Sequence, residues 1–85
     1  MLYLLWGAVV EKDLAGYEVY RGERSGFTAD EHSRVAFAEP EEYCEGRYVD
    51  RGLKHHTRYF YRVCAVDKQG SRGPLSEEFS AWTKE

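Results

Sequence analysis

Proline and cysteine are scarce in this sequence, basic residues are not in excess, and no apolar run is long enough to cross a membrane. The 85 residues include two Pro, two Cys, and 12 Lys and Arg against 15 Asp and Glu, for a formal net charge of −3. Two cysteines are too few to form a disulfide framework. A nucleic-acid-binding module would carry a basic face, so nucleic acid is not an expected partner.

The most apolar segment, residues 1–10, lacks the features of a signal peptide. It has no basic stretch at its start, and Glu11, Lys12 and Asp13 follow it without a small-residue cleavage site. It is also shorter than the roughly 20 residues that a membrane-spanning helix needs. We therefore expect a buried strand here and no membrane insertion. Residues 1–85 are expected to form a single domain that is a piece of a longer protein.

Aromatic residues, by contrast, are abundant. Seven Tyr, four Phe and two Trp make up 15% of the chain, and hydrophobic residues make up 42%. This is enough apolar surface for one core, and it argues against a disordered chain. Cys44 is expected in a loop or at a strand edge, and Cys64 in the middle of a strand. Because no rule places the two within bridging distance, we expect both thiols to be free.

The rest of the chain is organised around residues 53–67. From position 59, two sets of side chains alternate: Tyr59, Tyr61, Val63 and Ala65 in one, and Phe60, Arg62, Cys64 and Val66 in the other. Successive side chains of a strand point to opposite faces, so the first set can line one face of a core. The pattern predicts the central strand of an antiparallel sandwich.

Shorter alternating segments, separated by turn residues, predict further strands. These are the segment that holds Leu2, Leu4 and Trp6, and residues 16–21, 34–38, 47–50 and 75–83. Their inward side chains are expected to include Leu4, Trp6, Tyr17, Val19, Phe79 and Ala81, with Glu18, Tyr20, Ser80 and Trp82 pointing outward. Short strands at this spacing, with no helical periodicity, are typical of a sandwich or a small barrel.

In their order and spacing, these residues resemble a fibronectin type III domain over nearly the whole chain. The matching pieces are Leu4-x-Trp6 with Ala8-Val9, Asp13-Leu14-Ala15-Gly16-Tyr17-Glu18-Val19-Tyr20-Arg21, Tyr48-x-Asp50-x-Gly52-Leu53, Thr57-x-Tyr59-x-Tyr61-x-Val63-x-Ala65-Val66-Asp67, Gly70, Gly73-Pro74, Ser76 and Ser80-Ala81-x-Thr83. The resemblance implies an all-β, immunoglobulin-like antiparallel sandwich. It also implies that Trp6 packs between the sheets. Leu53 and Tyr59 would form a tyrosine corner, in which the Tyr hydroxyl bonds to backbone a few residues upstream.

The sequence departs from this family at its start. A complete domain of the type has a strand well before the Leu4-x-Trp6 motif, whereas only residues 1–3 precede Leu4 here. We therefore expect the first strand to be missing or truncated. An unpaired edge beside Trp6 would invite another chain, so a dimer through this N-terminal edge is possible.

The segments Asp13-Leu14-Ala15-Gly16-Tyr17 and Ala65-Val66-Asp67 resemble bacterial modules that are appended to enzymes acting on polysaccharides. This resemblance implies a non-catalytic accessory module. It would be a spacer or interaction domain within a larger secreted or surface bacterial protein, a glycoside hydrolase, located outside the cell. Its partners would be neighbouring domains of that protein, or a polysaccharide or protein ligand, and no cofactor is expected.

An outward aromatic row is the candidate contact surface. If residues 68–74 close a hairpin, Phe60 lies opposite Trp82, and pairing of the second strand with the central one puts Tyr20 beside Phe60. Below this row, Glu18 and Arg62 could form a cross-strand ion pair. An exposed aromatic patch with a polar rim marks a contact surface. The row could bind sugar rings, cover a neighbouring domain, or only stabilise the sheet.

The other groups of polar and charged residues in the sequence do not form a known catalytic or metal-binding motif. It contains no nucleophile elbow, no HExxH motif and no phosphate-binding glycine loop, so it is not expected to be an enzyme. His55 and His56 are neighbours in a turn and would point apart, and His32 is expected in a solvated loop, so no metal site is predicted. The acidic run 39–45 lacks the alternating oxygen ligands of a calcium loop. A receptor-like protein-recognition domain would instead use the loops 22–34 and 68–74.

Overall fold

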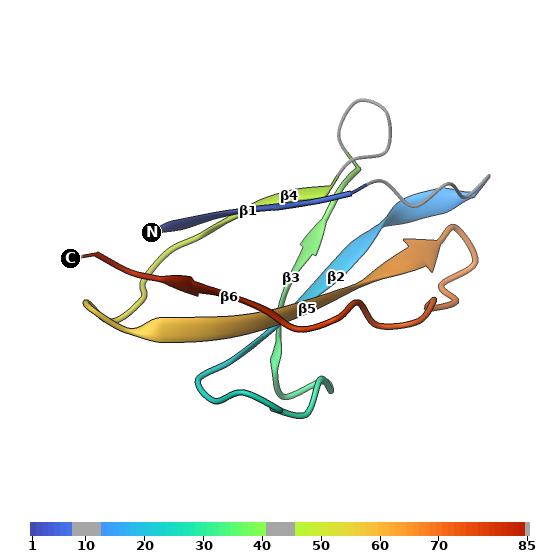
Figure 1. The fold of residues 1–85 in the computed structure, drawn as a ribbon. Coiled ribbons are helices and arrows are strands. Elements are labelled where there is room, and N and C mark those ends of the chain that lie inside the picture. Colours follow the sequence, from blue (N-terminus) through green and yellow to red (C-terminus); the bar gives the residue numbers. More distant parts are fainter. Residues whose placement is uncertain (8–12, 41–45, 85) are drawn as a thin grey trace.

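The computed structural model describes residues 1–7, 13–40 and 46–84, which form an all-β sandwich of two antiparallel sheets (Figure 1). The strands are β1 Leu2–Trp6, β2 Leu14–Gly22, β3 Arg34–Ala38, β4 Gly46–Asp50, β5 Arg58–Asp67 and β6 Phe79–Trp82. β1 pairs with β4 in a two-stranded sheet, and the second sheet has the order β3-β2-β5-β6. The predicted all-β sandwich is therefore confirmed. Within the described residues, no helix is long and apolar enough to cross a membrane.

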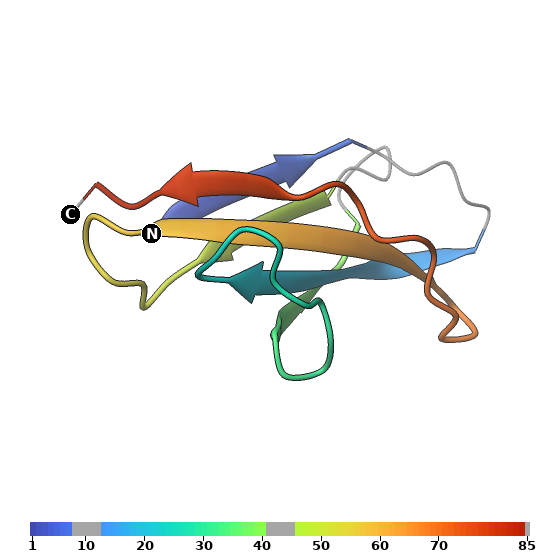
Figure 2. The same cartoon turned by 60° about the horizontal axis from the view of Figure 1, so that its bottom comes forward.

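The strands begin and end close to their predicted positions, with one exception. β2 is slightly longer than expected, β5 covers the alternating part of residues 53–67 from Arg58 onward, and β3 has the predicted bounds. The last strand is shorter, because residues 75–78 form no ladder and only Phe79–Trp82 pairs with β5. Figure 2 shows how the long β5 runs through the middle of the larger sheet, as expected of a central strand.

The core lies between the two sheets and contains the residues expected from the alternation. Six residues of the predicted inward set are buried, namely Leu4, Tyr17, Val19, Tyr59, Tyr61 and Val63, and Leu2, Leu14 and Ala38 are buried with them. Trp6, Leu53, Phe79 and Ala81 are partly buried and pack against the core cluster. Ala65, also predicted inward, is half-buried towards the end of β5. The parity derived from the sequence is therefore right for both sheets.

Trp6 occupies the position between the sheets that the sequence predicts. Its indole meets the ring of Tyr17 edge to face, with centroids 5.4 Å apart and an interplanar angle of 80°. Across the small sheet, Trp6 pairs with Gly46. A Cβ atom added to Gly46 would lie 1.6 Å from Trp6 Nε1. Glycine is required at this position because the indole fills the space of a side chain.

The predicted tyrosine corner is present. The backbone nitrogen of Lys54 donates a hydrogen bond to the Tyr59 hydroxyl at 2.9 Å, five residues upstream of that tyrosine. Leu53, the residue before Lys54, packs against the core. The contact ties the connection that leads from β4 in one sheet to β5 in the other.

A buried charge links the two sheets. Asp50, at the end of β4, is 2% exposed and accepts two hydrogen bonds from Nη1 of Arg21 on β2. The Tyr61 hydroxyl on β5 donates to the same carboxylate at 2.7 Å. This cluster was not predicted from the sequence, and it holds the small sheet onto the large one.

Cys64 is a buried free thiol on β5. The prediction that Cys44 is also a free thiol falls on a residue outside the described part of the chain.

Candidate functional site

The outer face of the β3-β2-β5-β6 sheet, which points away from β1 and β4, carries the predicted contact residues. On β6, however, Trp82 lies opposite Arg58 and not opposite Phe60, so the predicted register is wrong. The turn after β5 is tighter than expected, since the backbone nitrogen of Gly70 donates to the Asp67 carbonyl at 3.0 Å. Because the turn is tighter, β6 pairs with β5 in a register different from the predicted one.

The predicted register between β2 and β5 is also wrong, by two residues. Tyr20 lies opposite Arg62, while Phe60 lies opposite Gly22. No short turn joins these two strands, so nothing local fixes their offset. A shift of two residues keeps every side chain on its face, and the outward parity of Tyr20 is therefore right although its neighbour is not. Tyr20 is only 5% exposed, so it cannot belong to an exposed aromatic row.

The predicted ion pair between Glu18 and Arg62 does not form. Glu18 lies opposite Cys64, and Arg62 Nε donates to the backbone carbonyl of Ser76 at 2.9 Å. Glu18 instead forms ion pairs with Arg34 at 2.8 Å and with Arg72. The observed register places Arg62 opposite Tyr20, two residues away from the position opposite Glu18. Arginines from β3 and from the β5–β6 connection neutralise Glu18 instead.

The carboxylate of Glu18 is the centre of this charge cluster. Its side chain is 10% exposed, and Oε1 accepts a hydrogen bond from the Tyr20 hydroxyl at 3.0 Å. The hydrogen bond from Arg72 is the main cause that lowers the pKa of Glu18, against the opposing effect of burial. Burial, together with the bond to Glu18, raises the pKa of Tyr20 to about 12. At neutral pH the cluster therefore holds a carboxylate, two guanidiniums and a neutral phenol.

Cys64 lies beside this cluster but is not set up as a nucleophile. Its Sγ is 3.9 Å from Glu18 Oε1, and the residue is 3% exposed. Burial raises the pKa of the Cys64 thiol, so the reactive thiolate is disfavoured.

Arg58 separates the aromatic rings of β5 and β6. Its guanidinium lies 5.1 Å from the ring centroid of Phe60 and 5.8 Å from that of Trp82. Arg58 Nη2 also donates to the Ser80 hydroxyl at 3.0 Å. Cation–π contacts of this kind fix the rings against the sheet. Trp82 is 60% exposed on this face, and Phe37 on β3, which lies opposite Glu18, is a second exposed aromatic side chain at 52%.

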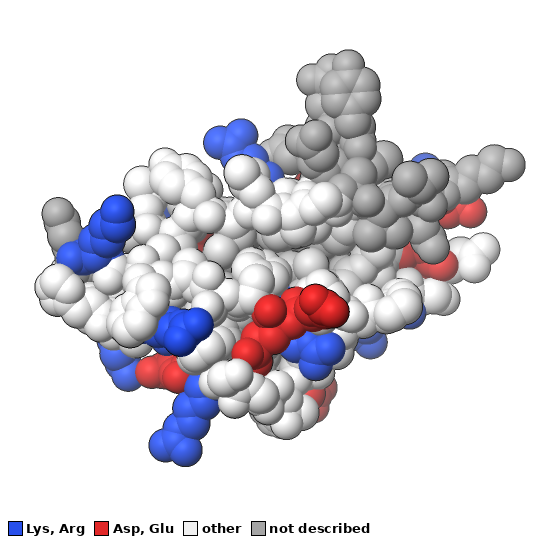
Figure 3. Space-filling view, in the orientation of Figure 1, with Lys and Arg blue, Asp and Glu red and all other residues white. Residues whose placement is uncertain are grey.

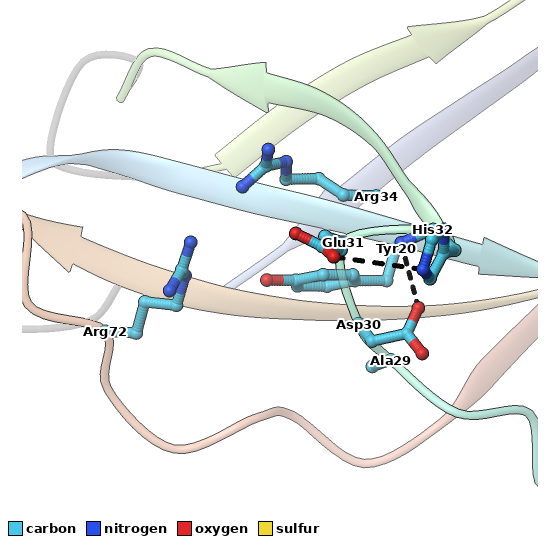
Figure 4. A pocket seen from close by; sticks show the side chains of 7 residues that line it. All are labelled: Tyr20, Ala29, Asp30, Glu31, His32, Arg34 and Arg72. Carbon is cyan, nitrogen blue, oxygen red and sulfur yellow. Dashed lines mark hydrogen bonds and ion pairs between the residues drawn. The ribbon is translucent and has the colours of Figure 1, made fainter.

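A hollow of about 690 Å³ opens beside the charge cluster (Figure 4). It is lined by Tyr20, Ala29, Asp30, Glu31, His32, Arg34 and Arg72. These residues come from β2, from the start of β3, and from the two loops 23–33 and 68–78. Figure 4 shows Tyr20 between Arg34 on one side and Arg72 on the other, with the acidic residues of the first loop at the rim. The hollow thus offers charged groups of both signs.

Hydrogen bonds hold the first of these loops in place. The carboxylate of Glu78, just before β6, accepts from the Ser25 hydroxyl at 2.7 Å and from the backbone nitrogen of Gly26 at 2.6 Å. Asp30 accepts from the backbone nitrogens of His32 and Ser33, which shapes the turn into β3. The loop that forms this wall is therefore anchored both to the segment just before β6 and within itself.

The structure brings no metal ligands together in the part of the chain that it describes, where no group of three or more His, Cys, Asp or Glu side chains lies at ligand distance. His55 and His56 are exposed in the turn before β5, and His56 has a positive φ of 49°. His32 is exposed in the loop, 3.8 Å from Glu31. Positions 41–45 of the acidic run lie outside the described residues.

The arginines that organise this face were not predicted from the sequence. Arg58 is adjacent to the predicted strand and shares the outward parity of Phe60, so its position could have been found by extending the alternation one residue. Arg34 and Arg72 meet Glu18 from segments 16 and 54 residues away in the chain. No local pattern carries that information.

No family model, no curated protein and no solved structure gives a significant match to this chain. The resemblance to a fibronectin type III domain therefore stays a prediction that rests on the residues quoted for it.

Proposed function

We propose that the chain is a non-catalytic accessory module of the fibronectin type III kind. It would belong to a larger secreted or cell-surface bacterial protein and would act there as a spacer that contacts a partner. The tyrosine corner supports the family part of this proposal: Lys54 N lies 2.9 Å from the Tyr59 hydroxyl, the contact that the resemblance implies. The packing of Trp6 against the core also fits it.

The outer face carries the contact part of the proposal. Its main support is the hollow between the two loops, whose lining includes Arg34 and Arg72, the two arginines that are ion-paired to Glu18. A face whose side chains are already fixed by ion pairs loses little conformational entropy on binding. This favours recognition of a folded neighbour, either another domain of the parent protein or a separate protein, over a purely inert spacer.

Carbohydrate binding is the second candidate, and one observation favours it. The indole of Trp82 is 60% exposed while Arg58 fixes its position, so one face of the ring can stack on a sugar. With Tyr20 buried and Phe60 half-buried, the site would use the exposed ring of Trp82 and not the three-ring row. The assignment to a glycoside hydrolase rests on the sequence segments alone.

A binding screen of the chain against soluble and insoluble polysaccharides tests the two candidates. The variant Trp82→Ala removes the exposed ring, and Phe37→Ala is the matched control, since Phe37 is an exposed aromatic residue on β3. Saturable binding that Trp82→Ala abolishes and Phe37→Ala keeps would establish the sugar site. Release of reducing sugar is measured in the same samples. Hydrolysis of a polysaccharide by the purified chain would overturn the non-catalytic proposal.

A companion measurement tests docking through the hollow. The domains that adjoin the chain in its parent protein are added to it, and binding is followed by NMR chemical shifts. Chemical-shift changes that centre on Arg34 and Arg72 and disappear in Arg72→Ala would support docking. Shifts confined to the opposite sheet would overturn it.

A further inference from the structure

β1 is an edge strand with none of the usual protection against pairing. It has five residues, Leu-Tyr-Leu-Leu-Trp, and pairs with β4 in an unbroken register. Among the described strands, β4 is its one partner. Natural edge strands carry charges, proline or a bulge that discourage a second chain. β1 has no charged residue, no proline and no bulge, so its free backbone groups are open to another strand.

The side chains beside this edge are apolar and exposed. Tyr3 is 62% exposed and Leu5 73%, on the face of the small sheet that points to solvent, and Met1 is 62% exposed. Their inward neighbours Leu2 and Leu4 are buried in the core. Figure 3 shows that the surface over β1 is formed mostly by uncharged residues. A second strand placed there would cover apolar surface as well as satisfy backbone groups.

A groove lies beside β1 on the side that does not pair with β4. It has a volume of about 360 Å³ and is lined by Met1, Leu2 and Tyr3 from the start of β1 and by Trp82 and Lys84 from the end of β6. The edges of the two sheets thus come together along this groove. Nothing described lies between them, and an added strand beside β1 would run along it.

We propose that the occupant is β1 of a second copy of this chain, paired antiparallel to form a homodimer. A strand paired antiparallel with its own copy has two-fold symmetry, so the same edge forms both halves of the interface. It is also compatible in charge, since an uncharged strand meets no like charge across the axis. The result is a continuous four-stranded sheet in the order β4-β1-β1-β4.

The alternation of β1 selects a register for this pairing. With Leu4 opposite Leu4 of the second copy, Tyr3 lies opposite Leu5 of that copy, and the same pair recurs on the other side of the axis. Both members of this pair point to solvent in the monomer. Their contact would bury the most exposed apolar residues of the small sheet, and aromatic–aliphatic pairs directly opposite each other stabilise antiparallel strands.

The oligomeric state of the full chain tests the proposal. Sedimentation equilibrium from micromolar to millimolar concentration should show a reversible monomer–dimer transition. The variant Leu5→Lys should weaken dimerisation by about tenfold, because it places a charge in the apolar contact. Phe37→Lys is the matched control: Phe37 is 52% exposed on β3 of the other sheet, and its replacement should leave the dimer unchanged.

Two double variants test the register. Tyr3→Lys with Leu5→Lys puts like charges opposite each other and should abolish the dimer, whereas Tyr3→Glu with Leu5→Lys puts opposite charges there and should restore it. Circular dichroism confirms that each variant is folded. Equal behaviour of the two double variants would overturn the register and with it the proposed pairing.

Amide hydrogen exchange gives an independent result. In the dimer, amides of Leu2–Trp6 should become more protected as the protein concentration rises. A strictly monomeric chain at millimolar concentration would overturn the proposal. So would protection of these amides that does not depend on concentration, because another segment of the same chain would then occupy the edge.

Discussion

Arg21 on β2 and Asp50 on β4 form an ion pair that joins the two sheets across the edge of the core. Nη1 of Arg21 lies 2.8 Å and 2.9 Å from the two carboxylate oxygens of Asp50. The aspartate side chain is 3% exposed and the arginine side chain 29%. Tyr61 donates a third hydrogen bond to the carboxylate, and burial together with Asp50 raises the pKa of its hydroxyl. Asp50 is thus a buried charge whose partners come from the opposite sheet.

The variant Arg21→Met should lower the free energy of unfolding by about 3 kcal/mol, because it leaves the buried carboxylate of Asp50 without its cation. Urea unfolding at neutral pH measures the change. Lys54→Met is the matched control, since the ion pair between Lys54 and Glu23 is exposed on both sides. An exposed pair contributes little to stability, because water and salt screen it. Equal losses in the two variants would contradict a special role for the buried pair.

Glu18 should make the stability depend on pH in the acid range. The hydrogen bond from Arg72 is the first cause that lowers its pKa in the folded state from the ordinary value of 4.5. A carboxylate whose folded pKa is depressed stabilises the fold fully above its unfolded pKa. That contribution is lost as the pH falls from about 4.5 through the lower folded pKa.

The variant Glu18→Gln should therefore unfold with a flatter pH dependence below the ordinary carboxylate pKa, besides being less stable at neutral pH. Urea unfolding at neutral pH and at several acid pH values measures both effects. Glu77→Gln replaces an exposed glutamate on the segment before β6 and should leave the profile unchanged. A Glu18→Gln profile that parallels the parent protein would show that Glu18 does not set the acid dependence.

The strands and the faces of this fold could be predicted from the sequence, because each depends on neighbours in the chain. Alternation alone placed Tyr59, Tyr61 and Val63 in the core, and all three are buried. The register between strands cannot be predicted in the same way, because a shift of two residues keeps every side chain on its face and leaves the local pattern unchanged. That is why Tyr20 was paired with Phe60 when Arg62 is its partner.

The candidate site was predicted less well than the fold, for a related reason. Its central contact joins Glu18 to Arg34 and Arg72, whose side chains converge only after β3 and the β5–β6 connection have folded onto β2. Many arginines in the chain could have paired with Glu18. Choosing among them requires the register and the path of the loops, and both of these are tertiary properties.

The tyrosine corner gives a prediction about stability. Tyr59→Phe should cost about 1–2 kcal/mol, because the connection between β4 and β5 loses the part-buried acceptor of Lys54 N. Thermal or urea unfolding measures the loss. Tyr3→Phe, which removes a hydroxyl from a tyrosine that is 62% exposed, should change the stability very little. Identical behaviour of the two variants would mean that the hydroxyl of Tyr59 adds nothing to the fold.

Trp6 and Gly46 should behave as a coupled pair. Trp6→Ala should cost about 3 kcal/mol, at the low end for a large-to-small change, because the indole is only half-buried. Gly46→Ala should cost about 1–3 kcal/mol, because its Cβ would lie 1.6 Å from Trp6 Nε1 and the indole would have to move. In the double variant the clash is gone, since the ring that causes it has been removed. The combined loss should therefore be smaller than the sum of the two single losses.

Gly7→Ala is the control for this cycle, since a Cβ on Gly7 would meet nothing within 4 Å. It should be close to neutral alone and should add its small effect independently to that of Trp6→Ala. Urea unfolding of each variant supplies the free energies. Strict additivity of Trp6→Ala and Gly46→Ala would show that the glycine is needed for its backbone and not for the space that the indole fills. A melting temperature unchanged by Trp6→Ala would remove Trp6 from the core.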